Sequence, residues 1–91
     1  MQVKFYASLR QAAGTKMMEV DFHSGTTIRD VLDEVTQRYP VLVKFIWKDQ
    51  GELSEFVHIF LNGENIRHLA GLDSALKPDD HVDIFPPLVG G

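Results

Sequence analysis

The sequence predicts an α+β fold in which a mixed sheet of about four or five strands carries one main helix across one face. Residues 3–9 and 81–85, near the two ends of the chain, are apolar at every second position, as half-buried strands are. Between them, residues 28–35 are apolar at i, i+3, i+4 and i+7, the spacing of a helix with one buried face. These segments are expected to form the core of one small domain.

The first two strands are expected to pair as an antiparallel hairpin. Val3, Phe5, Ala7 and Leu9 alternate with polar or amphipathic residues, which predicts a single strand across residues 3–9. The segment 12–15 interrupts this pattern, and residues 17–22 then alternate again as a second strand.

The clearest helix of the chain is expected to begin after Thr27. Thr27 and Asp30 have the spacing of a capping box, with Asp in place of the usual Glu or Gln. Each fully buried side chain of its apolar stripe would contribute about 1.5–3 kcal/mol, and Pro40 stops the helix. We expect residues 42–47 to form a short helical or turn segment and residues 48–55 an exposed loop.

The rest of the chain is expected to complete the sheet. Asn62-Gly63 is the strongest short hairpin signal in the sequence. The remaining expected elements are a third strand at 57–61, a fourth short strand at 65–67, a helical turn at 69–76, a tight turn at 77–80 and the last strand at 81–85.

The first and last strands are best placed side by side at the centre of the sheet. They would pair in parallel, and the chain would pass from one to the other through the helix, as a right-handed crossover. One sheet with one helix across it is a β-grasp roll, the arrangement of ubiquitin-like proteins. The expected organisation is therefore a β-grasp domain over residues 1–87 and a flexible tail over residues 88–91 that leaves from the end of a central strand.

Composition excludes several classes of function. The chain has 91 residues and no cysteine, so it offers no disulfide framework, thiol nucleophile or thiolate metal site. Nine Lys and Arg against 13 Asp and Glu give a net charge of −4, which disfavours nucleic acid and suits a basic protein partner. The four histidines lack helical ligand spacing, so no metal site is expected. Without a signal-like or membrane-spanning apolar run, a cytoplasmic location is expected.

The two glycines at the end, Gly90 and Gly91, are the most distinctive feature. Without side chains they are thin enough to enter a narrow tunnel. A terminal carboxylate, with a pKa near 3.3–3.7, is anionic at neutral pH, and the glycines can deliver it into the active site of another protein. Pro86 and Pro87 have no N–H donors, so they end sheet pairing and aim the tail outward.

A partner-binding face is expected beside this tail. If Val3 and Phe5 point into the core, then Tyr6, Phe60 and Phe85 point to the other side of the sheet. Exposed aromatic residues that gather on one face are typical of a docking surface. Packing in the helix-facing core is the alternative for each of them, and most of all for Phe60.

The tail residues Phe85-Pro86-Pro87-Leu88-Val89-Gly90-Gly91 resemble those of the MoaD/ThiS sulfur-carrier family, and in particular the small subunit of molybdopterin synthase. The resemblance covers essentially the whole chain. One departure is the bulky Leu88-Val89 pair, where the family commonly has one aliphatic and one small residue. The other matching segments are Val3–Ala7, Gly25-Thr26-Thr27, Leu61-Asn62-Gly63 and Leu72–Asp80.

The resemblance implies a carrier without an active site of its own. An activating enzyme would adenylate the carboxylate of Gly91 with ATP and convert it to a thiocarboxylate, which donates sulfur in molybdenum cofactor synthesis. It also implies that Tyr6 and Phe85 contact the activating enzyme or the synthase large subunit. We expect Gly90 to belong with Gly91 to the reacting end of the chain. The other expected partner-binding residues are Phe60, Pro86, Pro87, Leu88 and Val89. The chain itself is expected to bind no cofactor.

Three alternatives remain open at this point. The chain resembles archaeal-type small modifiers, which implies isopeptide bonds from Gly91 to lysines of target proteins. A sulfur carrier for tRNA thiolation would use the same activation chemistry. A β-grasp domain that only binds partners, with an inert tail, would react with neither ATP nor an activating enzyme.

Overall fold

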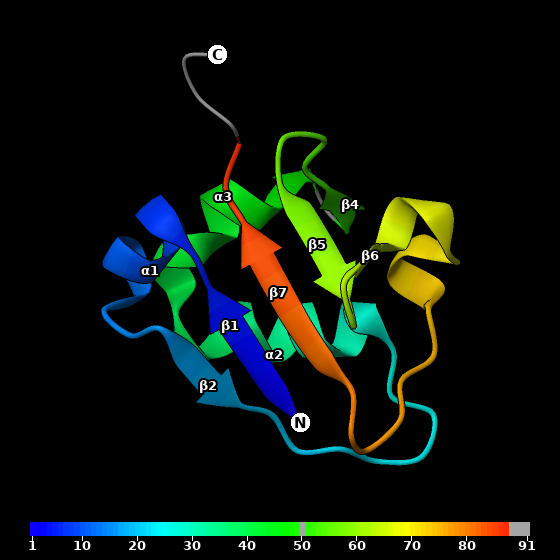
Figure 1. Ribbon diagram of the computed structural model, residues 1–91. Helices are drawn as coiled ribbons and strands as arrows, with labels where there is room; N and C mark the ends of the chain where they lie inside the picture. The colour runs from blue at the N-terminus through cyan, green and yellow to red at the C-terminus, as the bar shows by residue number, and fades with distance from the viewer. Residues whose placement is uncertain (50, 88–91) are drawn as a thin grey trace.

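The computed structural model describes residues 1–49 and 51–87, and it confirms the predicted β-grasp architecture. Five strands form a mixed sheet in the order β2-β1-β7-β5-β6, and helix α2 crosses behind this sheet in Figure 1. The elements of the sheet and its main helix are β1 (Gln2–Phe5), β2 (Met17–Glu19), α2 (Ile28–Arg38), β5 (His58–Leu61), β6 (Glu64–Asn65) and β7 (His81–Phe85). The connecting elements are α1 (Ala7–Ala13), η1 (Pro40–Leu42), α3 (Val43–Ile46), β3 (Trp47–Asp49), β4 (Glu52–Leu53), η2 (Ile66–His68) and η3 (Gly71–Asp73).

The two central strands are β1 and β7, which pair in parallel as predicted. Val3 lies opposite Val82, and Phe5 lies opposite Ile84. All four side chains are fully buried, because they point from the sheet toward α2. On its other side β7 pairs antiparallel with β5. The last strand of the described residues is therefore hydrogen-bonded on both edges.

Helix α2 begins and ends where the sequence predicts. The Thr27 hydroxyl accepts a hydrogen bond from the Asp30 N–H, and the Asp30 carboxylate accepts one from the Thr27 N–H at 2.9 Å, which completes the capping box. The helix stops at Arg38, before Pro40. Its apolar stripe is buried against the sheet, through Ile28, Val31, Leu32 and Val35.

The predicted first strand over residues 3–9 is wrong beyond Phe5. Residues Ala7–Ala13 form helix α1, which ends at Gly14 with φ +77. Leu9 is buried in the helix, as the predicted strand also required, so apolar alternation alone does not distinguish a strand from this short helix. Local hydrogen bonds hold the helical turn: the Arg10 guanidinium donates to the Phe5 carbonyl at 3.1 Å, and the N–H of Leu9 donates to the Tyr6 carbonyl. Strands β1 and β2 pair antiparallel, but α1 separates them in the chain.

Other differences concern the short elements. Residues 48–55, predicted as a loop, include most of the β3–β4 ribbon, in which Trp47 pairs with Leu53. The Arg29 guanidinium donates to the Gly51 carbonyl at 3.1 Å and holds this ribbon against α2. Strand β2 ends at Glu19 instead of residue 22. Strand β6 covers Glu64–Asn65, and residues 66–68, expected mainly in a strand, form η2.

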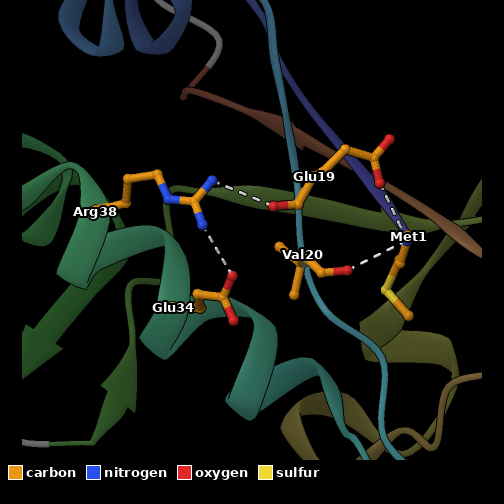
Figure 2. A network of polar contacts seen from close by, with 5 residues as sticks. All are labelled: Met1, Glu19, Val20, Glu34 and Arg38. Atoms are coloured by element: carbon orange, nitrogen blue, oxygen red, sulfur yellow. Dashed lines mark hydrogen bonds and ion pairs between the residues drawn. The ribbon is translucent and has the colours of Figure 1, made fainter.

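A polar network holds the edge strand β2 in place (Figure 2). Arg38 at the end of α2 donates to the Glu19 carbonyl at 3.3 Å and pairs with Glu34 at 3.3 Å. The Met1 amino group contacts the Glu19 carboxylate at 3.3 Å and the Val20 carbonyl at 3.2 Å. Such exposed pairs are each worth only about 0–1 kcal/mol, so the network orients β2 more than it stabilises the domain.

None of the helices within the described part of the chain combines the length and the apolar character needed to cross a bilayer.

Candidate docking face and tail exit

The structure brings Tyr6, Phe60 and Phe85 together on the face of the sheet that α2 leaves open. The Tyr6 and Phe85 rings stack with centroids 4.2 Å apart and planes inclined by 12°. The Phe60 ring meets Phe85 edge to face at 5.4 Å. All three side chains are half-buried, so they do not belong to the core under α2. We call these three residues the aromatic face.

Tyr6 reaches this face because the chain turns sharply after β1. The Tyr6 N–H donates to the Ile84 carbonyl at 3.2 Å, so its backbone still follows β7. The next residue, Ala7, has φ +51, in the left-handed region that disfavours a residue with a Cβ. The Arg10 guanidinium lies 5.6 Å from the centre of the Tyr6 ring on the returning helix α1. Tyr6 therefore contacts β7 through its backbone and α1 through its ring.

Asp83 fixes the other end of the Tyr6 side chain. The Tyr6 hydroxyl donates to Asp83 Oδ1 at 3.1 Å. Desolvation by burial raises the pKa of Tyr6 above its usual 10.0, and the negative charge and hydrogen bond of Asp83 raise it further. The positive charge of Arg10 acts in the opposite direction. The phenol is therefore held as a neutral hydrogen-bond donor.

A hollow of about 400 Å³ opens next to the aromatic face. It lies over β5 and β7, where Asp83 is opposite Phe60 and His58 is opposite Phe85. Its far end is bounded by Gly63, in the turn between β5 and β6. Lys4, on β1, is the neighbour of Asp83 on the opposite edge of β7.

Strand β7 lies between β1 and β5 (Figure 1) and ends at Phe85, a residue of the aromatic face. Phe85 is the last residue of the strand, Pro86 is buried and Pro87 is half-buried. Because neither proline has an N–H, the sheet ladder cannot extend through them. The other predicted tail residues, Leu88, Val89, Gly90 and Gly91, lie outside the described residues.

Sequence reasoning missed Asp83 and Arg10. The signal for Asp83 was present, because alternation within His81–Phe85 places it on the same face as Phe85. Arg10 could not be found while residues 3–9 were interpreted as one strand. Across residues 1–49 and 51–87, no cluster of three or more His, Asp or Glu side chains is arranged to hold a metal ion.

Comparison with known proteins covers the whole chain. The model of the ThiS family matches residues 3–91. Small archaeal modifier protein 1 of Haloferax volcanii is 33% identical over 91 residues, which cover 100% of both chains. A putative sulfur carrier protein of Archaeoglobus fulgidus is 32% identical over 100% of this chain and 98% of its own.

Solved structures share the same architecture. The crystal structure of SAMP1 from Haloferax volcanii superposes with a TM-score of 0.88 at 32% identity, over 99% of this chain and 97% of that one. The crystal structure of the Amycolatopsis orientalis BexX/CysO complex contains a chain that superposes with a TM-score of 0.83 at 27% identity, over 99% of this chain and 98% of that one. A putative molybdopterin converting factor, subunit 1, from Pyrococcus furiosus superposes with a TM-score of 0.76 at 29% identity, over 96% of this chain and 95% of that one.

Proposed function

This chain belongs to the ThiS family, in which it resembles sulfur carriers and ubiquitin-like modifiers, and we propose that it is a sulfur carrier that works through the carboxylate of Gly91. The carboxylate oxygen attacks the α-phosphorus of ATP in an activating enzyme, and pyrophosphate leaves. A sulfur donor at the sulfide level (HS⁻) then attacks the acyl-adenylate carbon, the bond from this carbon to the AMP oxygen breaks so that AMP leaves, and Gly91 carries a thiocarboxylate. ATP is bound by the enzyme, and the carrier needs no active site of its own.

One observation supports this proposal above the others: the last strand of the described residues is central in the sheet and ends directly at the aromatic face. Phe85 belongs to both, since it ends β7 and stacks on Tyr6. An enzyme that binds the aromatic face therefore receives the tail from a fixed point. Four residues follow Pro87, and at about 3.3–3.6 Å each they extend the reach by roughly 13–14 Å, which suits delivery of Gly91 into a recessed site.

For the sulfur acceptor, we propose a molybdopterin precursor, with this chain as the small subunit of a two-subunit synthase. The Pyrococcus furiosus relative named as a molybdopterin converting factor subunit supports this choice, as does the Phe85-Pro86-Pro87 segment before the tail. Copurification with a synthase large subunit from the same organism, and sulfur transfer from the charged carrier, would test it. A charged carrier that supports only tRNA thiolation would overturn this acceptor while leaving the sulfur-carrier role intact.

The activation step is tested by intact mass spectrometry. The protein is incubated with ATP, an activating enzyme and a sulfur donor, and we expect one oxygen to be replaced by sulfur. A variant without Gly90 and Gly91 should not be charged, although the described core, from Val3 to Ile84, is unchanged. A variant extended by one residue beyond Gly91 is the matched control, because it keeps both glycines but moves the carboxylate. No charging of the wild type under conditions that charge a known carrier would refute the proposal.

A second candidate function is protein modification through an isopeptide bond from Gly91 to target lysines. The full-length similarity to a protein named as a small archaeal modifier favours it. The two functions share the adenylation step, so one protein can perform both. High-molecular-weight conjugates of a tagged chain on a denaturing blot, lost when Gly91 is deleted, would support modification. Thiocarboxylate formation without any conjugates, under growth and stress conditions, would support the carrier function and contradict protein modification.

A further inference from the structure

The hollow beside the aromatic face combines aromatic walls with one carboxylate. Phe60 and Phe85 line it together with Asp83, His58 and Gly63, and its volume is about 400 Å³. Asp83 lies in the middle of β7, directly opposite Phe60 on β5. A negative charge is thus set among aromatic rings on a surface that is otherwise suited to apolar contacts.

The carboxylate of Asp83 is only partly used within the protein. Its hydrogen bond from Tyr6 occupies Oδ1. Among the residues that the structure describes, Asp83 forms no ion pair. Lys4 is its cross-strand neighbour but comes from β1, on the side away from the hollow, which is lined from β5, β7 and the turn at Gly63. One carboxylate oxygen is therefore available to a group that enters the hollow.

A basic side chain fits this chemistry. An ammonium or guanidinium group is attracted to the face of an aromatic ring within about 6 Å of its centre. The same group forms its strongest hydrogen bonds with a carboxylate. The aliphatic stem of Lys or Arg packs well on apolar surface, so both parts of the side chain would find a partner here. A carboxylate in the hollow would be repelled by Asp83. A purely apolar side chain would leave the second carboxylate oxygen of Asp83 without a partner.

We propose that this hollow receives a Lys or Arg side chain of the activating enzyme. The inference rests on the proposed function, because that enzyme must hold Gly91. The residue that lines the hollow nearest the tail is Phe85, after which only Pro86 and Pro87 precede residues 88–91. An enzyme that holds the tail covers this hollow as well. Asp83 thus recognises the enzyme through charge, while the aromatic rings supply apolar contact area.

The test compares two variants that lose the same charge. Asp83→Asn keeps an oxygen that can accept the Tyr6 hydrogen bond, so the stack on Phe85 is retained. Asp79→Asn removes a carboxylate from the exposed turn before β7, away from the hollow. Both are assayed by ATP–pyrophosphate exchange with the activating enzyme of the same organism, after thermal melting has shown that they fold. The KM and kcat for the carrier are measured at low and high salt.

For Asp83→Asn we expect the KM to rise about tenfold with kcat within about twofold of the wild type. We expect Asp79→Asn to behave like the wild type. The salt dependence of KM should be weaker for Asp83→Asn than for Asp79→Asn, because one screened ion pair is lost. If Asp83→Asn matches Asp79→Asn while the wild type is charged normally, the basic-side-chain inference is overturned alone. If the wild type gives no exchange, the proposed function fails and the inference fails with it.

Discussion

The Tyr6 ring lies flat on the Phe85 ring, with centroids 4.2 Å apart. Tyr6 follows the first strand of the sheet, and Phe85 is the last residue of the central strand from which the tail leaves. The hydroxyl of the same tyrosine donates to Asp83, so three residues join the start of the chain to the base of the tail. This arrangement fixes the aromatic face next to Pro86 and Pro87, which precede residues 88–91.

The first prediction concerns the centre of the aromatic face. Phe85 makes two ring contacts, with Tyr6 and Phe60, whereas Phe60 makes one. Each aromatic pair is worth about 0.5–1.5 kcal/mol beyond burial. Phe85→Ala should therefore lower the free energy of unfolding by about 0.5–1.5 kcal/mol more than Phe60→Ala does. Urea denaturation measures both. Equal losses would show that the Tyr6 stack contributes nothing.

The second prediction concerns the ionisation of Tyr6. The chain has two tyrosines, so Tyr39→Phe leaves Tyr6 as the single titrating phenol, and the edge-to-face contact of residue 39 with Phe5 can be kept. Burial and Asp83 raise the folded-state pKa of Tyr6 above 10.0. The midpoint of its tyrosinate absorbance should therefore lie above pH 10, and Asp83→Asn should lower this midpoint, because the negative charge is gone. An identical midpoint in both proteins would contradict the assigned role of Asp83.

The raised pKa of Tyr6 also predicts how the free energy of unfolding depends on pH. The folded pKa of Tyr6 lies above the unfolded value of 10.0, so the folded state holds its proton more tightly. The resulting stabilisation is complete below pH 10 and is lost as the pH rises through the folded pKa. Tyr6→Phe cannot lose a proton, so this variant should show a smaller decrease in the free energy of unfolding across that range.

The third prediction concerns the turn into α1. Ala7 has φ +51, which costs a residue with a Cβ about 1–2 kcal/mol, whereas Gly adopts it freely at an entropic cost of about 0.5–1 kcal/mol. Ala7→Gly should therefore stabilise the protein by up to about 1 kcal/mol. Ser8→Gly, at the next and exposed position of α1, should instead destabilise it by about 0.5–1 kcal/mol. The two denaturation midpoints should move in opposite directions, and a parallel shift would refute the strain at Ala7.

The fourth prediction concerns the capping box of α2. Thr27→Ala removes the hydroxyl that accepts from the Asp30 N–H and should cost about 0.5–2 kcal/mol. Thr27→Ser keeps the hydroxyl and serves as the control. Thermal melting of both variants measures the difference. If Thr27→Ser melts as low as Thr27→Ala, the methyl group of Thr27 matters and the cap does not.

Much of the fold could be predicted because strong local patterns coincide with the long-range arrangement. The stripe of Ile28, Val31, Leu32 and Val35 can be buried only by a helix, and the capping box marks where that helix begins. Strand β7 alternates without ambiguity, so its pairing with β1 and the position of Phe85 on the open face follow. The short elements were harder to predict, since residues 7–13 and 47–53 carry patterns that fit more than one structure.

By itself, therefore, the sequence determined the sheet, its main helix, the central position of β7 and the aromatic face around Phe85, because period-two and helical spacing are local properties. Only the tertiary structure decided that the chain turns at Ala7, that Tyr6 bonds to Asp83, and that Asp83 shares a hollow with Phe60. The contacts of Asp83 with Tyr6 and Phe60 join residues far apart in the chain, and the turn at Ala7 places Tyr6 where it can reach Asp83. Their energies depend on distances that the folded backbone sets, so no local pattern of residues encodes them.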